Sequence, residues 1–353
     1  MQNESLESSF LSIFALITFF VFLIISKYSH KIKKGILLDQ DFSKPQAFHL
    51  SPISRSGGLA VIISLNIFFI FYNLIYSKVL LEYFFICNSM FFIGFLDDLK
   101  IKITPSKRLT LMIAFLFFFI YLFTIKIFYI DISFLTILLS NNIFSSIFVL
   151  LCFLFTINGS NLIDGFNGLL ALNLIIINSI LAYMNLTNGI NHFSVFIIGQ
   201  IIILFSFLLF NFPKAKIFFG DSGSYLMGSL VALNVIVTNN LNPEYSSFFF
   251  CTILFYLFFE VFFSFFRKIF QKKSPLHPDN KHLHMLVFEK VSLVFGKDKG
   301  NYINSLVINL SYLSLVLPAI IFAKNPLISK YWFFSLIVIY LFIYLRLYRL
   351  TKN

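Results

Sequence analysis

Long apolar segments alternate with short polar ones along the whole chain. About eleven apolar segments approach the ~20 residues that a helix needs to cross the hydrocarbon core of a bilayer. They lack the period-two alternation of membrane-barrel strands, so they predict helices. The polar segments between them are too short to form a separate soluble domain. The predicted spans are residues 9–26, 57–76, 80–96, 109–128, 142–157, 168–184, 193–212, 222–239, 247–266, 302–323 and 331–345.

Composition supports the same class of protein. Hydrophobic residues make up 59% of the chain and charged residues 12%, and the mean hydropathy is +0.89. A soluble globular chain is far less apolar. We therefore predict an all-α integral membrane protein in which residues 1–353 form a single polytopic domain.

The basic residues are distributed unevenly between the two sets of loops that eleven spans create. One set contains 23 of the 27 Lys and Arg: loops 27–56, 97–108, 158–167, 213–221 and 267–301, with the C-terminal segment 346–353. The positive-inside rule places this set in the cytoplasm, with the N-terminus outside and the C-terminus cytoplasmic. The net charge of +12 thus reflects topology and indicates no nucleic-acid partner.

Nearly all unusual polar motifs fall on this cytoplasmic side, most of them at membrane boundaries. They include an acidic pair, Gly- and Asn-rich turns and a histidine cluster. Scattered surface turns would not be so one-sided. We therefore expect the cytoplasmic loops 27–56, 97–108, 158–167, 213–221 and 267–301 to form the active face.

The acidic pair Asp97–Asp98 follows the end of the third predicted span. A helix C-terminus disfavours negative charge, so a solvated cap explains the pair poorly. Two adjacent carboxylates suit a divalent cation or a metal-bound phosphate. The basic residues that follow, up to Arg108, are explained either by topology or by contact with lipid headgroups.

Two further motifs combine polar residues with glycine. In NGSNLIDGFNGLL, Asn161, Asp164 and Asn167 recur at three-residue spacing, which a helix would place on one face; an ordinary polar loop is the alternative. In GDSG, Asp221 is a reasonable N-cap for the eighth span. A helix start with free N–H groups is also where phosphate binds.

The histidines of PDNKHLHM form the last motif. His282 and His284 have a spacing seen in zinc sites, but no cysteine accompanies them. Contact with a phosphate or a sugar is therefore the favoured interpretation.

In their joint order these motifs resemble the polyprenyl-phosphate N-acetylhexosamine-1-phosphate transferases. That superfamily contains enzymes that initiate surface polysaccharides and the phospho-N-acetylmuramoyl-pentapeptide transferase of peptidoglycan synthesis. The chain matches R-x-G-G, G-F-L-D-D, N-x-x-N-x-x-D-G-x-N-G-L, F-N-x-P-x-x-x-x-x-G-D-S-G and P-D-x-x-H-x-H. The resemblance extends from about Arg55 to His284.

The resemblance implies three catalytic residues. Asp97 and Asp98 would lie near the metal and the lipid phosphate, and Asp221 would ligate Mg²⁺, with Mn²⁺ as a substitute. The positions that match substrate-binding residues are Arg108, Asn161, Asp164, Asn167, Asn211, Phe218, His282 and His284. Among these, Asn211 and Phe218 would lie near the uridine, with Phe218 stacking on the base, and the histidines would cover the diphosphate and the sugar.

Two departures bear on the branch of the family. Met285 stands where the polysaccharide branch usually has another histidine, and the consecutive histidines of the peptidoglycan branch are absent. The initiating transferase is therefore favoured, and the pentapeptide transferase is the alternative. The implied partners are a UDP-N-acetylhexosamine, a polyprenyl phosphate and the bacterial inner membrane, with the active site facing the cytoplasm; a homodimer is compatible with this picture.

A transporter is the alternative from another functional class. It would need ionisable residues in the middle of the membrane. The predicted spans are almost free of them, and Glu260 is the main exception.

Overall fold

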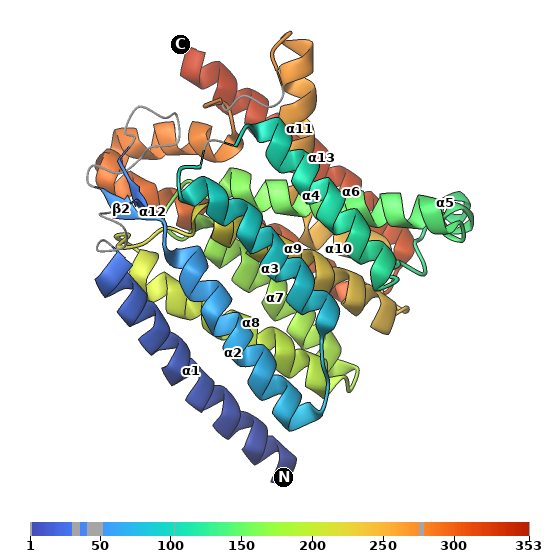
Figure 1. Ribbon diagram of the computed structural model, residues 1–353. Helices are drawn as coiled ribbons and strands as arrows, with labels where there is room; N and C mark the ends of the chain where they lie inside the picture. The colour runs from blue at the N-terminus through green and yellow to red at the C-terminus, as the bar shows by residue number, and fades with distance from the viewer. Residues whose placement is uncertain (1, 30–35, 41–51, 102, 275–278, 353) are drawn as a thin grey trace.

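The computed structural model describes residues 2–29, 36–40, 52–101, 103–274 and 279–352. Most of the described chain is helical (Figure 1). The helices are α1 (Gln2–Tyr28), α2 (Gly57–Tyr76), α3 (Leu81–Asp98), α4 (Pro105–Leu122), α5 (Ser133–Leu139), α6 (Asn142–Ile163), α7 (Leu169–Thr187), α8 (Asn191–Asn211), α9 (Gly220–Leu241), α10 (Ser247–Ile253), α11 (Phe255–Phe270), α12 (Leu283–Ile321) and α13 (Pro326–Lys352). The strands β1 (Leu38–Asp39) and β2 (Ile53–Ser54) form a short antiparallel pair.

Every predicted span overlaps a helix or, for 247–266, the pair α10–α11, although 109–128 extends six residues beyond the end of α4 at Leu122. Within the described chain, eight helices are long and apolar enough to cross a membrane, and the pair α10–α11, bent by 77°, makes a ninth. A multi-pass helical membrane protein is therefore confirmed. The count of eleven and the sides of the termini stay predictions.

The other two predicted spans coincide with α3 and α9, which are not among the helices found long and apolar enough to cross a membrane. α3 carries Glu82 and the acidic pair at its two ends. α9 is buried along almost its whole length, since it packs against α2, α3, α6 and α7. A helix surrounded by protein can carry polar residues that a lipid-facing helix cannot.

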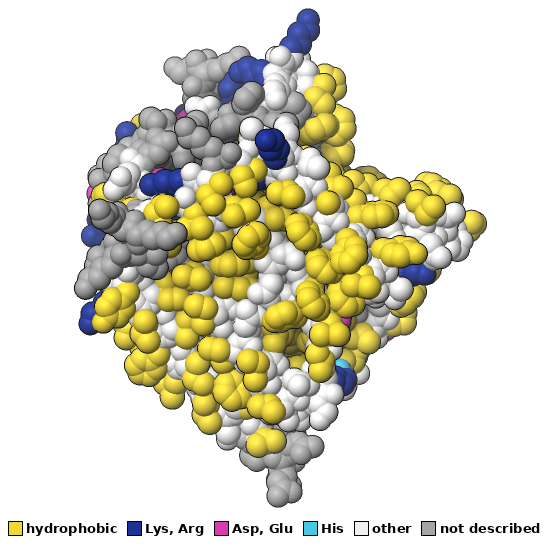
Figure 2. All heavy atoms as spheres, viewed as in Figure 1, with side chains coloured by type: hydrophobic (Ala, Val, Ile, Leu, Met, Phe, Trp, Pro, Cys, Tyr) yellow, Lys and Arg dark blue, Asp and Glu magenta, His cyan; other side chains and the backbone are white. Residues whose placement is uncertain are grey.

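Large apolar side chains cover much of the surface seen in Figure 2. Phe20 of α1, Leu74 of α2 and Phe118 of α4 are all more than half exposed. Such a broad apolar surface is expected where protein faces lipid. The Lys and Arg side chains visible in Figure 2 gather mainly toward the end where α11 and the C-terminal part of α13 lie.

Helix boundaries differ from the prediction in two of the expected loops. α6 continues to Ile163, so the first half of 158–167 is helical; Gly159 packs there against the backbone of Leu257 in α11. Much of 267–301 is also helical, because α12 begins at Leu283 and is only interrupted by non-helical backbone at Gly296. Packing between helices thus extends structure into segments that their polarity marked as loops.

Candidate active site

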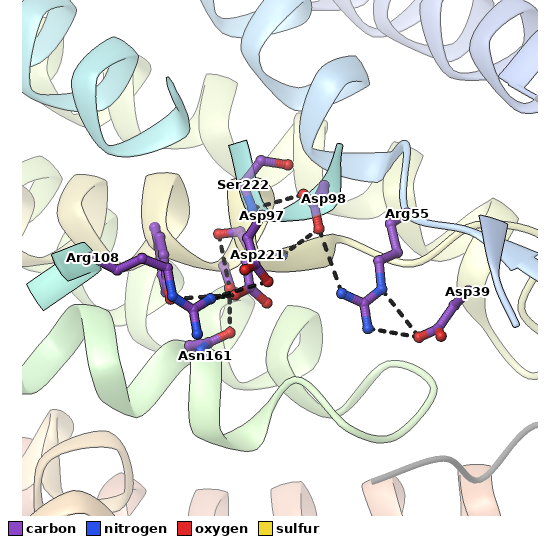
Figure 3. A network of polar contacts seen from close by, with 10 residues as sticks. Asp39, Arg55, Asp97, Asp98, Arg108, Asn161, Asp221 and Ser222 are labelled. Atoms are coloured by element: carbon purple, nitrogen blue, oxygen red, sulfur yellow. Dashed lines mark hydrogen bonds and ion pairs between the residues drawn. The ribbon is translucent and has the colours of Figure 1, made fainter. Parts of the chain in front are cut away.

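The acidic motifs meet where the C-terminal ends of α3 and α6 approach the first turns of α4 and α9 (Figure 3). Asp97 and Asp98 are the last two residues of α3, and Asp221 lies in the first turn of α9. In Figure 3, Arg108 lies on one side of these aspartates and Arg55 on the other. Sequence segments more than a hundred residues apart therefore form one charged cluster.

Asp98 binds the N-terminus of α9. Its two carboxylate oxygens accept the N–H groups of Asp221 at 3.1 Å and Ser222 at 3.0 Å. An anion is favoured at a helix N-terminus, where the first N–H groups have no partner inside the helix. Asp98 is only 2% exposed, so this side chain joins α3 to α9 and is largely closed to solvent.

Gly220 makes this contact sterically feasible. Its φ is +71°, and a Cβ atom there would lie 2.6 Å from both carboxylate oxygens of Asp98. Gly94 on α3 similarly lies against the backbone of Asp221, where a Cβ would approach the carbonyl oxygen to 2.4 Å. The glycines around GDSG therefore allow α3 and α9 to approach closely enough for the carboxylate to reach the helix end.

Asp97 and Asp221 share Arg108. Its Nη1 lies 3.1 Å from Asp97 Oδ2 and also contacts Asp221 Oδ2. Tyr225, one turn further along α9, donates its hydroxyl to the same Asp221 oxygen at 3.3 Å. Unlike Asp98, these aspartates remain partly exposed, with 29% of the Asp97 side chain and 18% of the Asp221 side chain accessible. They are the carboxylates that a ligand can reach.

Arg55 occupies the other side of the cluster. Its Nε and Nη2 donate to Asp39 Oδ2 at 3.1 and 2.7 Å, and its Nη1 lies 3.8 Å from Asp98 Oδ1. Burial lowers the pKa of Arg55, but the charges of Asp39, Asp221 and Asp98 outweigh this and raise it. Asp39 was missed from the sequence, because a lone Asp in a polar loop carries no signal of its own.

Among the described residues, carboxylates outnumber guanidinium groups here, and both burial and this excess of negative charge act on the pKa values. Burial and the charge of Asp221 raise the pKa of Asp98, while hydrogen bonding from Ser222 and the charge of Arg55 oppose this. Burial and Asp221 likewise raise the pKa of Asp164 to about 8. The cluster is thus short of positive charge.

The donor set fits a magnesium ion held partly by substrate. Among the described residues, no three His, Cys, Asp or Glu side chains converge as a metal cage. Mg²⁺ is usually bound by one or two carboxylates together with substrate phosphates and water. Asp221 and Asp97, partly exposed and next to each other around Arg108, supply that number of carboxylates.

The Asn-rich turn lies beside the charged cluster, and its three polar residues do not share one face of a helix. Asn161, still in α6, accepts a hydrogen bond from Ser224 of α9 at 3.0 Å. Asp164 follows the last helical residue, and Asn167 lies in the turn, where its side chain donates to the Pro213 carbonyl at 2.9 Å. Of the two alternatives, a common helical face does not hold and a turn does for Asp164 and Asn167, because the helix ends at Ile163.

Asn211 and Phe218 differ in accessibility. Asn211 is buried; it accepts from the Gly168 N–H and donates to the Ile217 carbonyl at 2.8 Å. Its side chain therefore links the Asn-rich turn to the segment that leads into α9. Phe218 is partly buried, and its backbone is hydrogen-bonded to Ser54 and Gly57. Its ring is thus the more accessible of the two predicted uridine contacts.

The histidines form a second cluster, organised by Glu260. His282 Nδ1 lies 3.1 Å from Glu260 Oε1, and its Nε2 lies 3.3 Å from Asp279. Glu260 also accepts the Leu283 N–H at 3.1 Å and the Tyr340 hydroxyl at 2.7 Å. The buried carboxylate in the ninth predicted span therefore holds the start of α12. From the sequence, Glu260 stood out as an ionisable residue within a predicted span, but nothing indicated that it contacts His282.

His284 is buried, and its Nδ1 lies 3.2 Å from the Tyr256 hydroxyl. Its ring packs edge-on against Phe166, the aromatic residue of the Asn-rich turn. Its Nε2 has no hydrogen-bond partner among the described residues. The histidine cluster therefore adjoins the turn, whereas the aspartates gather around the two arginines.

The chain matches known proteins in this same region. A model of the glycosyl transferase family 4 matches residues 79–239. The undecaprenyl-phosphate alpha-N-acetylglucosaminyl 1-phosphate transferase of Thermotoga maritima is 28% identical over 281 residues, which are 78% of this chain and 80% of the relative.

Shorter matches link the chain to the phospho-N-acetylmuramoyl-pentapeptide-transferases. The Leuconostoc mesenteroides protein is 43% identical over 82 residues, 23% of this chain and 25% of the relative. The Streptococcus uberis protein is 34% identical over 152 residues, 40% of this chain and 44% of the relative. The family match covers Asp97, Asp98, Arg108, the Asn-rich turn and Asp221. The residues that build the charged cluster are thus largely those of the matched segment, and over this segment the chain is similar to the glycosyl transferase family 4.

Proposed function

We propose that this protein transfers N-acetylhexosamine 1-phosphate from a UDP-sugar to undecaprenyl phosphate, releasing UMP. The product would start a lipid-linked surface polysaccharide such as O-antigen. The observation that carries the proposal is the sharing of Arg108 by two partly exposed carboxylates, Asp97 and Asp221, at one end of the helical bundle. The Thermotoga relative, named for this reaction, matches most of the chain.

The reaction joins two anions. An oxygen of the lipid phosphate attacks the sugar-proximal phosphorus of the UDP-sugar, and the bond from that phosphorus to the bridging oxygen breaks. UMP leaves with the bridging oxygen and its electron pair. Arg108 and Arg55 can neutralise phosphate charge during this approach. Asp97 can accept a proton if the lipid phosphate arrives protonated.

Asp221, with Asp97 beside it, would hold Mg²⁺, or Mn²⁺ in its place. When bound, the ion would neutralise charge on the UDP-sugar diphosphate and polarise the phosphoanhydride bond that breaks as UMP leaves. Phe218 offers a ring for the uracil, and the polar turn with Asn161, Asp164 and Asn167 offers contacts for the sugar nucleotide.

Two alternatives give different outcomes. The pentapeptide transferase performs the same chemistry on a larger sugar, and its named relatives match shorter parts of the chain. A transporter would need an ionisable group open to a path through the membrane. Glu260 argues against such a path, because His282, Leu283 and Tyr340 occupy its carboxylate oxygens.

The proposal includes a location and an orientation. Eleven spans would place the N-terminus outside and the C-terminus in the cytoplasm of a bacterial cell, in the inner membrane. The active face would then meet soluble UDP-sugar from the cytosol and undecaprenyl phosphate from the bilayer. The uneven distribution of Lys and Arg between the loops supports this orientation.

The decisive experiment identifies the nucleotide product. Membranes containing the protein are incubated with undecaprenyl phosphate and a panel of UDP-sugars that includes UDP-GlcNAc and UDP-N-acetylmuramoyl pentapeptide. We expect UMP, and exchange of labelled UMP into the UDP-sugar, because one phosphoanhydride replaces another and the reaction is readily reversible. UDP as the sole nucleotide product would reject the proposal, and activity confined to the pentapeptide substrate would establish the alternative.

The metal is tested through Asp221. Asp221→Asn keeps the size of the side chain and removes its charge, and we expect turnover to fall by roughly 10²-fold or more. Glu244→Gln is the matched control, because it removes a carboxylate from an ion pair with Lys324 in the segment between α9 and α10. Normal turnover of Asp221→Asn, or of the wild type in excess chelator, would exclude a metal held here.

A further inference from the structure

Asp39 and Arg55 lie on neighbouring strands of a small hairpin at the edge of the charged cluster. Leu38 pairs with Ser54 and Asp39 with Ile53, and the Arg55 N–H donates to the Leu37 carbonyl at 2.9 Å. The two charged side chains are therefore brought together by strand register. Leu37 is buried and anchors this part of the hairpin in the protein.

The hairpin is joined to the segment that leads into α9. Ser54 pairs with Ile217, and the Phe218 N–H donates to the Ser54 carbonyl at 2.8 Å. The Gly57 N–H in turn donates to the Phe218 carbonyl at 2.8 Å. Arg55 is thus fixed relative to both Phe218 and the start of α9.

Among the described residues, Asp39 binds one edge of the Arg55 guanidinium, and the other edge has no hydrogen-bond partner. Asp39 Oδ2 accepts both Nε and Nη2, which leaves three of the five N–H donors of the group. Nη1 points toward Asp98 but is 3.8 Å away, too far for a hydrogen bond. The Asp98 oxygens are already occupied by the N–H groups of α9, and 22% of the Arg55 side chain is exposed.

Such an edge suits a phosphate. A planar guanidinium binds phosphate oxygens through two parallel N–H groups, and its orientation decides whether it can do so. Without Asp39, nothing described in the structure would keep Arg55 from turning fully into the neighbouring carboxylates Asp98 and Asp221, whose charges already act on it.

We propose that Asp39 is a positioning residue that holds Arg55 with its free edge directed at a phosphate group of one reacting substrate. This proposal rests on the proposed transferase function. Both substrates, the lipid phosphate and the UDP-sugar, supply the same chemistry at this edge, and their separate KM values distinguish them.

The first test is Asp39→Asn, which keeps the shape of the side chain but not its charge. We expect KM to rise roughly tenfold or more for the substrate whose phosphate Arg55 binds, as for a weakened charge-assisted hydrogen bond. KM for the other substrate and kcat should change by less than about threefold. Glu244→Gln, which weakens the Glu244–Lys324 ion pair, is the matched control and should leave both KM values unchanged.

A double-mutant cycle shows whether Asp39 acts through Arg55. In an Arg55→Ala background, Asp39→Asn should cost less than about twofold, because the group that it positions is gone. A purely structural role would produce the same loss in both backgrounds and would overturn the proposal. So would a lower kcat with both KM values unchanged, or no effect of Asp39→Asn on either.

A second variant keeps the test valid if Asp39→Asn does not accumulate. Asp39→Glu retains the charge but lengthens the side chain by one methylene, which displaces the guanidinium, so KM for the same substrate should again rise. An unchanged KM in folded Asp39→Glu, checked by its apparent Tm, would overturn the positioning role. The wild type serves as the separate check on the proposed function: if it releases no UMP from any UDP-sugar, the transferase itself is rejected.

Discussion

Substitution of the two adjacent aspartates, one at a time, should separate a structural role from a catalytic one. Asp98→Asn removes a buried charge from the N-terminus of α9, whereas Asp97→Asn removes a partly exposed charge from Arg108. The structure predicts that both variants lose activity and that only Asp98→Asn loses substantial stability. From sequence alone the two residues are equivalent.

The magnitudes follow from the contacts. In Asp98→Asn one of two hydrogen bonds to backbone N–H groups is lost, and the charge no longer interacts with the helix end. Each effect costs about 1–2 kcal/mol, but the carboxylate's burial penalty and its repulsion from Asp221, which raise the pKa of Asp98, are also removed and offset part of it, leaving about 1–2 kcal/mol. Asp97 forms a partly exposed ion pair at 3.1 Å, which contributes about 0–1 kcal/mol.

The assay is thermal unfolding in detergent, combined with UMP release at saturating substrate. We expect an apparent Tm several degrees lower for Asp98→Asn and little changed for Asp97→Asn, with turnover reduced by roughly 10²-fold in Asp97→Asn. A third variant, Asp98→Ala, leaves both N–H groups without a partner and should be less stable than Asp98→Asn. Equal Tm values for Asp97→Asn and Asp98→Asn would refute the reasoning that Asp98 joins α3 to α9.

Three further predictions concern other parts of the molecule. Gly220→Ala should lower both Tm and activity, because its Cβ would lie 2.6 Å from the carboxylate that binds α9; a fully active, equally stable variant would contradict this. Glu260→Gln should weaken the contact with His282 and reduce turnover more than it reduces the amount of protein in the membrane, which in-gel fluorescence measures. Equal losses of turnover and of protein would contradict this. A reporter inserted at 187–191 should be external and one fused after Asn353 cytoplasmic, and a cytoplasmic 187–191 would contradict the shared active face.

The helices could be predicted from sequence because the bilayer imposes a simple rule. A chain that crosses hydrocarbon must satisfy its own backbone groups, so each long apolar segment predicts a helix. The same rule does not determine where a helix ends in contact with other helices. α6 continues through Asn158 to Ile163, where Ser160 and Gly159 are buried against neighbouring elements.

The sequence indicated which residues form the candidate site but not how most of them contact one another. Asp97, Asp221 and Arg108 stood out because charges are rare in this chain, and the structure places them in mutual contact. Asp39 could not be singled out, since its contact with Arg55 arises from strand register with the segment before Arg55. Glu260 was conspicuous as a charge within a predicted span. Its contact with His282, however, could not be predicted from the distance between the two residues in the sequence.

The N–H groups at the start of α9, in the GDSG motif, bind a side chain of the protein itself. The start of α9 was a candidate phosphate site because helix N-termini present free N–H groups. In the structure, the N–H groups of Asp221 and Ser222 are directed at Asp98. A phosphate cannot use them while that contact lasts, so its charge must be neutralised by side chains or by a bound cation. Arg108 and Arg55 are the guanidinium groups placed beside the aspartates. Removing the carboxylate that orients each of them, Asp97 for Arg108 or Asp39 for Arg55, should therefore change substrate binding. Neither change removes the contact between Asp98 and α9.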